Sequence, residues 1–182
     1  MSQERLERGN TALLVVDVQE RLCRAMPPAR LERLINRSLA LLEGARVLGL
    51  PVAYTEQYPT GLGPTIDPIR SKLGQAPRFE KVRFSSVSAD LLAALSQRRS
   101  VLIAGMEAHV CVYQTARDLK ERGFQAYLCR DAIISRADED REAGLALARE
   151  GGAVITTVEC ALFDLLGEAG TPEFRALSAA VK

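Results

Sequence analysis

The sequence predicts an α/β fold in three layers, with a parallel sheet between two layers of helices. Three observations lead to this fold class. Several strand-like segments are apolar without interruption, which is typical of strands buried on both faces. Segments with helical periodicity separate them, and strand–helix alternation favours parallel strands joined by right-handed crossovers. The 182 residues contain no repeat, low-complexity tract or linker, so residues 1–182 are predicted to form one domain.

Four apolar runs are predicted as buried strands: Thr11–Asp17, Leu50–Thr55, Val101–Ala104 and Ala153–Thr156. Gln125–Cys129 is a fifth candidate strand, and Glu80–Phe84 is a weaker sixth. Helices are predicted after Pro27, after Ser88, from Cys111 to Gly123, around Ala143–Gly151, after a capping box at Thr156 and Glu159, and after Thr171. Residues 56–78 are rich in glycine and proline and are predicted to form a long loop with a helical turn.

Composition narrows the class of protein. Apolar residues make up 47% of the chain and charged residues 26%, which are ordinary globular values. A net charge of +1, with no basic stripe or zinc-finger spacing, predicts no nucleic-acid partner. The four cysteines are irregularly spaced, which favours a reduced, cytoplasmic setting. The apolar run from Ala12 to Val16 is too short for a signal or membrane segment, so no membrane association is predicted.

Three reactive side chains lie at predicted strand ends, where open parallel sheets bind their ligands. Asp17 ends the first strand and could act as a base, or simply cap a helix or close a structural hydrogen bond. Lys81 lies in or beside the weakly predicted strand at Glu80–Phe84 and could hold a carboxylate and a thiolate by charge. A lysine at such a position is more commonly an exposed surface residue. Cys111 follows a strand and Gly105, at the predicted start of a helix.

A helix start favours a reactive thiol at Cys111. The macrodipole and unpaired N–H groups there would lower the thiol pKa and could also hold an oxyanion. The alternative is a small buried core residue. Cys129 and Cys160 are interpreted as structural, and Cys23 is expected in a loop where it could be exposed.

His109 is the only histidine, which excludes a histidine-rich metal site. It lies two residues before Cys111, an awkward position from which to deprotonate that thiol. We therefore expect His109 to line the substrate pocket or to support it.

The order Asp17-Val-Gln, Lys81 and Gly105-x5-Cys111-Val resembles the isochorismatase-like cysteine hydrolases, over nearly the whole chain. The resemblance implies a six-stranded Rossmann-like sheet of order 3-2-1-4-5-6 and an Asp–Lys–Cys catalytic triad at Asp17, Lys81 and Cys111. It also implies a cis peptide between Met106 and Glu107, and an oxyanion hole formed by the N–H groups of Glu107 and Cys111. Homo-oligomers are expected from the same resemblance.

The sequence departs from the nicotinamidase branch of this superfamily. Nicotinamidases carry an Asp-x-His metal motif after the second strand, whereas this chain has Glu56 and Tyr58 there. No metal and no cofactor are therefore predicted. The Glu107-Ala-His109 turn and residues 55–63 look most like the subgroup of isochorismatase domain-containing proteins.

The predicted activity is hydrolysis of a C–N bond in a small amide or carbamoyl substrate through a thioester on Cys111. Two alternatives stay open: hydrolysis of a vinyl ether, as in isochorismatase itself, and a non-catalytic binding or scaffold role. A dinucleotide-binding oxidoreductase is disfavoured because no glycine-rich turn follows the first strand. Candidate pocket residues share polar or aromatic side chains near the strand ends: Gln19, Glu56, Tyr58, Phe84 and His109.

Overall fold

The computed structural model describes residues 5–95 and 97–182 of the chain. Met1 to Glu4 and Ser96 belong to the predicted domain but lie outside the described residues. Six parallel strands form one sheet in the order β3-β2-β1-β4-β5-β6, which confirms the predicted fold class. The strands are β1 (Thr11–Val16), β2 (Val52–Gln57), β3 (Arg78–Lys81), β4 (Ser100–Met106), β5 (Gln125–Ile134) and β6 (Val154–Thr156).

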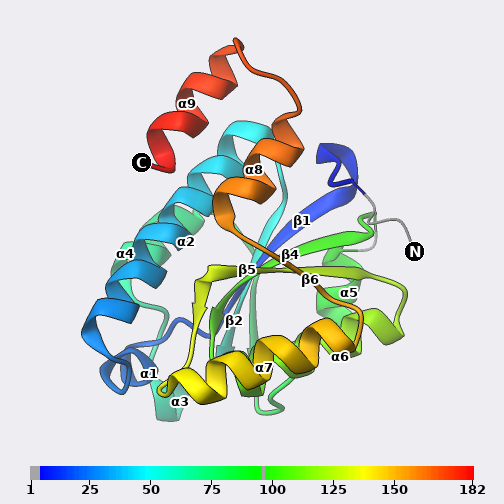
Figure 1. The fold of residues 1–182 in the computed structure, drawn as a ribbon. Helices are drawn as coiled ribbons and strands as arrows, with labels where there is room; N and C mark the ends of the chain where they lie inside the picture. Colours follow the sequence, from blue (N-terminus) through cyan, green and yellow to red (C-terminus); the bar gives the residue numbers. More distant parts are fainter. Residues whose placement is uncertain (1–4, 96) are drawn as a thin grey trace.

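Helices cover both faces of the sheet (Figure 1). One face packs against α1 (Glu20–Arg24), α2 (Pro28–Leu48), α4 (Asp67–Leu73), α8 (Val158–Leu166) and α9 (Pro172–Ala180). The other packs against α5 (Ala89–Leu95), α6 (Tyr113–Glu121) and α7 (Asp138–Glu150). A short helix, α3 (Pro59–Leu62), follows β2, and a π-helical turn at Ala108–Val112 precedes α6.

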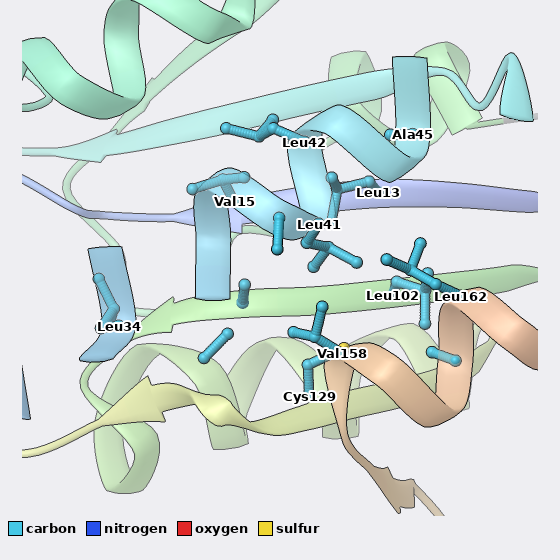
Figure 2. Close-up of a cluster of buried hydrophobic side chains, with 14 of the residues drawn as sticks. Leu13, Val15, Leu34, Leu41, Leu42, Ala45, Leu102, Cys129, Val158 and Leu162 are labelled. Carbon is cyan, nitrogen blue, oxygen red and sulfur yellow. The ribbon is translucent and has the colours of Figure 1, made fainter. Parts of the chain in front are cut away.

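The two central strands are buried along their whole length, and their side chains divide between two cores. Leu13 and Val15 of β1 and Leu102 of β4 point to the core under α2 and α8, which Figure 2 shows. Leu14 of β1 and Ile103 of β4 point to the opposite core. Unbroken apolar strands are needed because each face of the sheet is covered.

Element boundaries differ from the sequence-based predictions in ways that have local causes. The weak strand predicted at Glu80–Phe84 is wrong in position, since β3 spans Arg78–Lys81. Its side chains alternate between exposed and half-buried, as expected of an edge strand, so it has no apolar run to mark it. Residues 56–78 form β2's end, two short helices and β3's start rather than a loop with one helical turn.

The predicted capping box at Thr156 is also wrong. Because β6 continues through Thr156, the helix begins one residue later, and Thr157 accepts a hydrogen bond from the Cys160 N–H at 3.2 Å. The helices predicted after Ser88 and Thr171 are confirmed, and both residues cap them by accepting hydrogen bonds from the N–H groups of Leu91 and Phe174.

Two cysteine predictions are corrected. Cys23 is buried rather than exposed, because α1 carries it into the core. Cys160 is exposed rather than structural, because it lies on the outer side of the first turn of α8. Among the described residues, no helix is both long and apolar enough to cross a membrane.

Candidate active site

The sheet topology brings Asp17, Lys81 and Cys111 together at the carboxyl ends of the strands. Asp17 directly follows β1, Lys81 is the last residue of β3, and Cys111 lies in the π-helical turn after β4. The ammonium Nζ of Lys81 donates to Oδ2 of Asp17 at 2.6 Å, and both side chains are shielded from solvent. Asp17 and Lys81 lie close enough to the Cys111 thiol to shift its pKa in opposite directions.

Asp17 adopts a left-handed backbone conformation, with φ of 51°. Aspartate tolerates this region better than most residues, and non-glycine residues held there often belong to functional sites. The conformation turns the chain sharply after β1, and the Gln19 N–H closes the turn on the Asp17 carbonyl at 2.9 Å. Thr55 in β2 donates its hydroxyl to Oδ1 of Asp17 at 2.7 Å. The two carboxylate oxygens of this fully buried residue are thus bound by two different donors.

The ammonium group of Lys81 is held by other acceptors besides Asp17. Its ammonium group also donates to Oε1 of Gln57 at 2.8 Å and to the Phe84 carbonyl at 2.9 Å. Gln57 is itself held, because its Nε2 donates to the Val82 carbonyl at 2.7 Å. An ammonium group with several fixed acceptors has little freedom to swing away from the site.

Cys111 is buried, with 5% of its surface exposed. Burial raises the pKa of its thiol to about 12, and the negative charge and hydrogen bond of Asp17 also raise this pKa, whereas Lys81 lowers it. The expectation of a lowered thiol pKa at the helix start is therefore wrong for the resting site. Desolvation and the adjacent carboxylate outweigh the nearby ammonium group. The thiol is protonated at rest and lies beside the Asp17 carboxylate.

Two glycines let backbone segments approach the Cys111 turn. Gly105 has φ of 126°, and a Cβ there would lie 2.0 Å from the Val16 carbonyl oxygen. Gly144 of α7 has no room for a Cβ either, since it would come within 2.5 Å of the His109 nitrogen. Only glycine fits such positions without movement of the backbone. The peptide bond between Met106 and Glu107 is cis.

Ser135, just after β5, supports the same turn. Its hydroxyl accepts from the Ala108 N–H at 3.1 Å and lies 3.1 Å from Nδ1 of His109. The Glu107 carboxylate turns away from the triad to Arg136, whose Nε donates to it at 3.0 Å. His109 thus contacts Ser135, and its Nε2 lies 3.8 Å from Asp140. These contacts make His109 a support of the turn.

Two predicted pocket residues are buried and already bonded. The Gln19 amide donates to the carbonyls of Gln57 and Gly63 and accepts from the Gln57 N–H. The Glu56 carboxylate accepts from Thr65 and from Arg78. Substrate contacts for Gln19 and Glu56 stay predictions, and they would require these hydrogen bonds to break.

Tyr58 and Phe84, which were also predicted to line the pocket, are exposed. Tyr58 and Phe84 have 56% and 53% of their surfaces exposed, and Val82, which follows β3, has 76%. The Tyr58 N–H donates to the Lys81 carbonyl, and the Phe84 carbonyl accepts from the Lys81 ammonium group, so both lie beside the triad. Exposed apolar side chains at this place are suited to contact the apolar part of a ligand.

Sequence reasoning missed Thr55 and Gln57. Both lie at the end of β2, in a run of three buried polar residues with Glu56. A polar run that ends an otherwise apolar strand is the signal that could have found them, because buried polar groups need partners.

Comparison with known proteins agrees with the fold. The family model described as Isochorismatase domain matches residues 11–160. A parallel α/β sheet with this match defines an isochorismatase-like hydrolase fold. The chain belongs to the isochorismatase family.

Three relatives illustrate the range of the family. The secreted isochorismatase effector Isc1 of Phytophthora sojae (strain P6497) is 37% identical over 98% of this chain and 87% of its own. Isochorismatase domain-containing protein 2 of Bos taurus is 37% identical over 96% and 84%. The structure of the MAR1 ribonuclease from Caenorhabditis elegans has a TM-score of 0.93 at 34% identity, covering 98% of this chain and 92% of that one. Since one relative is secreted, a cytoplasmic location for this chain stays a prediction.

Proposed function

We propose that this protein is a cysteine hydrolase that cleaves a C–N bond in a small amide or carbamoyl compound. The observation that carries the proposal is the arrangement around Asp17, whose buried carboxylate accepts a hydrogen bond from Lys81 and whose charge acts on the buried Cys111 thiol. A buried thiol beside a buried carboxylate is a nucleophile with its own base.

The raised pKa of Cys111 shapes the first step. Because the thiol is protonated at rest, Asp17 would take its proton as the sulfur attacks the carbonyl carbon, rather than before substrate arrives. The ammonium group of Lys81 would stabilise the sulfur's developing negative charge and stay next to the carboxyl group once that is neutral.

Backbone N–H groups of the Cys111 turn would hold the oxyanion. The N–H groups of Ala108, Val110 and Val112 are already bonded to Ser135 or to the Glu107 carbonyl. As the resemblance to the isochorismatase-like cysteine hydrolases implies, we assign the oxyanion to the N–H groups of Glu107 and Cys111. A donor of this kind typically contributes roughly 3 kcal/mol to transition-state stabilisation.

The remaining steps return the site to its starting state. The protonated Asp17 gives its proton to the leaving nitrogen as the C–N bond breaks, which leaves a thioester on Cys111. Asp17 then takes a proton from water, whose oxygen attacks the thioester carbon. Collapse of that intermediate releases the acid, and the proton on Asp17 returns to the sulfur.

The test is a substrate panel assayed with wild-type protein and with Cys111→Ala. We expect ammonia or amine release from at least one amide or carbamoyl compound, and we expect Cys111→Ala to abolish it. The panel includes isochorismate and RNA, because relatives are described as an isochorismatase effector and a ribonuclease. Turnover of isochorismate or RNA that survives in Cys111→Ala, with none on amides, would contradict the thioester mechanism.

Three further points remain predictions: that the chain forms homo-oligomers, that its substrate is a small molecule, and that it binds no metal. Sedimentation of the purified protein and metal analysis of the same sample would test the first and the last.

A further inference from the structure

A cavity lies near the carboxyl end of β5, away from Asp17, Lys81 and Cys111. Its volume is about 330 Å³, and its walls come from the start of α2, the end of β5 and the start of α7. Arg30 of α2 is paired with Asp138 of α7, which joins the two helices across the cavity. Asp17, Lys81 and Cys111 are not among its lining residues.

Four arginines line this cavity: Arg30, Arg33, Arg130 and Arg141. With Arg37, which pairs with Asp131 at 3.7 Å, five guanidinium groups face three carboxylates, those of Asp131, Asp138 and Glu142. Arg130 and Arg141 share Glu142 as their partner. The described groups around the cavity therefore leave an excess of two positive charges.

Arg33 and Arg141 carry this excess in different ways. Arg33 has no hydrogen bond or ion pair with any residue in 5–95 or 97–182, although it lines the cavity. Arg141 is pinned to the end of β5, where its Nε donates to the Ile133 carbonyl at 2.8 Å. Burial lowers the pKa of Arg141, the charge of Glu142 raises it, and the charges of Arg130 and Arg33 lower it. These positive groups face one another with too few carboxylates between them.

We propose that the cavity binds the phosphate group of a small molecule. A phosphate monoester carries close to two negative charges near neutral pH, which matches the excess of two. Guanidinium groups that converge from two helices and a strand suit a tetrahedral group with several acceptor oxygens, whereas a flat carboxylate has one charge and two oxygens. The volume is at the lower end of the range for small-molecule sites, so the ligand is small.

Isothermal titration calorimetry at fixed ionic strength tests the proposal, with inorganic phosphate, glycerol 3-phosphate and acetate as probes. We expect saturable one-to-one binding of at least one phosphate compound and none of acetate. Tighter binding of glycerol 3-phosphate would identify a phosphorylated metabolite as the ligand, and tighter binding of inorganic phosphate would identify the free ion.

Three variants locate the binding. Arg33→Gln removes the arginine without a protein partner, so it should leave thermal unfolding unchanged and weaken phosphate binding by roughly tenfold or more. Arg149→Gln, an exposed arginine at the far end of α7, should bind like wild type. Cys111→Ala should also bind like wild type, which separates this site from the triad. Phosphate binding that is unsaturable, equal to acetate binding, or unchanged in Arg33→Gln would overturn the proposal.

Discussion

Thr55 donates its hydroxyl to Oδ1 of Asp17, while Lys81 donates to Oδ2 of the same carboxylate. The hydroxyl comes from β2 and the ammonium group from β3, so two strands orient one carboxylate that follows a third. The position of the Asp17 carboxylate therefore depends on the register of three neighbouring strands.

Thr55→Val should impair the site while keeping the shape of the side chain. Loss of the hydroxyl leaves Oδ1 of Asp17 buried without that donor, which typically costs about 1–3 kcal/mol. We expect a fall of roughly tenfold in kcat/KM on the amide that the panel identifies, and a lower free energy of unfolding in urea. Thr156→Val, at the end of the edge strand β6, is the control. Equal kcat/KM in wild type and Thr55→Val would show that Asp17 does not need this donor.

Gly144→Ala should displace the Cys111 turn. The new Cβ would meet backbone atoms of Ala108 and His109 at 2.5 to 2.6 Å, and backbone cannot move aside as a flexible side chain can. We expect a loss of about 1–3 kcal/mol in unfolding free energy, together with slower catalysis. Gly9→Ala is the matched control, because a Cβ there meets nothing within 4 Å. If both variants behave like wild type, α7 does not pack on the turn as described.

The rate at which Cys111 is alkylated should depend on the charges of Asp17 and Lys81 beside it. Since its pKa is about 12, the rate of modification by iodoacetamide should rise about tenfold per pH unit between pH 7 and 10. Asp17→Asn removes a charge that raises this pKa, so alkylation should be faster than in wild type. Lys81→Met removes a charge that lowers it, so alkylation should be slower.

Exposed Cys160 provides the internal reference for these rates, measured by peptide mass spectrometry. Its rate should be the same in all three proteins. A Cys111 rate that moves in the same direction in Asp17→Asn and Lys81→Met would mean that accessibility, rather than charge, governs the thiol.

Buried thiols should make the fold lose stability in alkali. Burial raises the pKa of Cys23 from 9.0 to about 11, and it raises that of Cys129 further. Above pH 9 the unfolded chain releases thiol protons that the folded chain keeps, so unfolding becomes easier as pH rises. The slope is at most about 1.4 kcal/mol per pH unit for each thiol, and for Cys23 it ends near pH 11.

Urea unfolding at pH 8, 9, 10 and 11 checks this, with Cys23→Ala compared with wild type. Lysines and tyrosines titrate equally in both proteins, so the difference between the two curves isolates Cys23. We expect the variant to be less stable than wild type at pH 8 and the gap to narrow by pH 11. A constant gap across this range would argue against a raised thiol pKa.

The sequence predicted the parallel sheet and the three strand-end residues, because apolar runs and reactive residues after them are local signals. It did not predict that Thr55 and Gln57 would hold Asp17 and Lys81. Those contacts depend on the pairing of Val16 with Thr55 and of Gln57 with Lys81, which no single segment encodes. The prediction of a lowered pKa for the Cys111 thiol was wrong for the same reason, because the burial of Cys111 arises from the packing of distant segments.

Gly105 has a consequence for how this protein can vary. The backbones that carry Asp17 and Cys111 approach at Val16 and Gly105 with no space for even a methyl group. A substitution at Gly105 would separate Asp17 from Cys111 in a single step, whereas the exposed side chains of Tyr58 and Phe84 could be exchanged without moving either. Directed evolution toward new substrates should therefore accumulate changes at these exposed positions and leave Gly105 untouched.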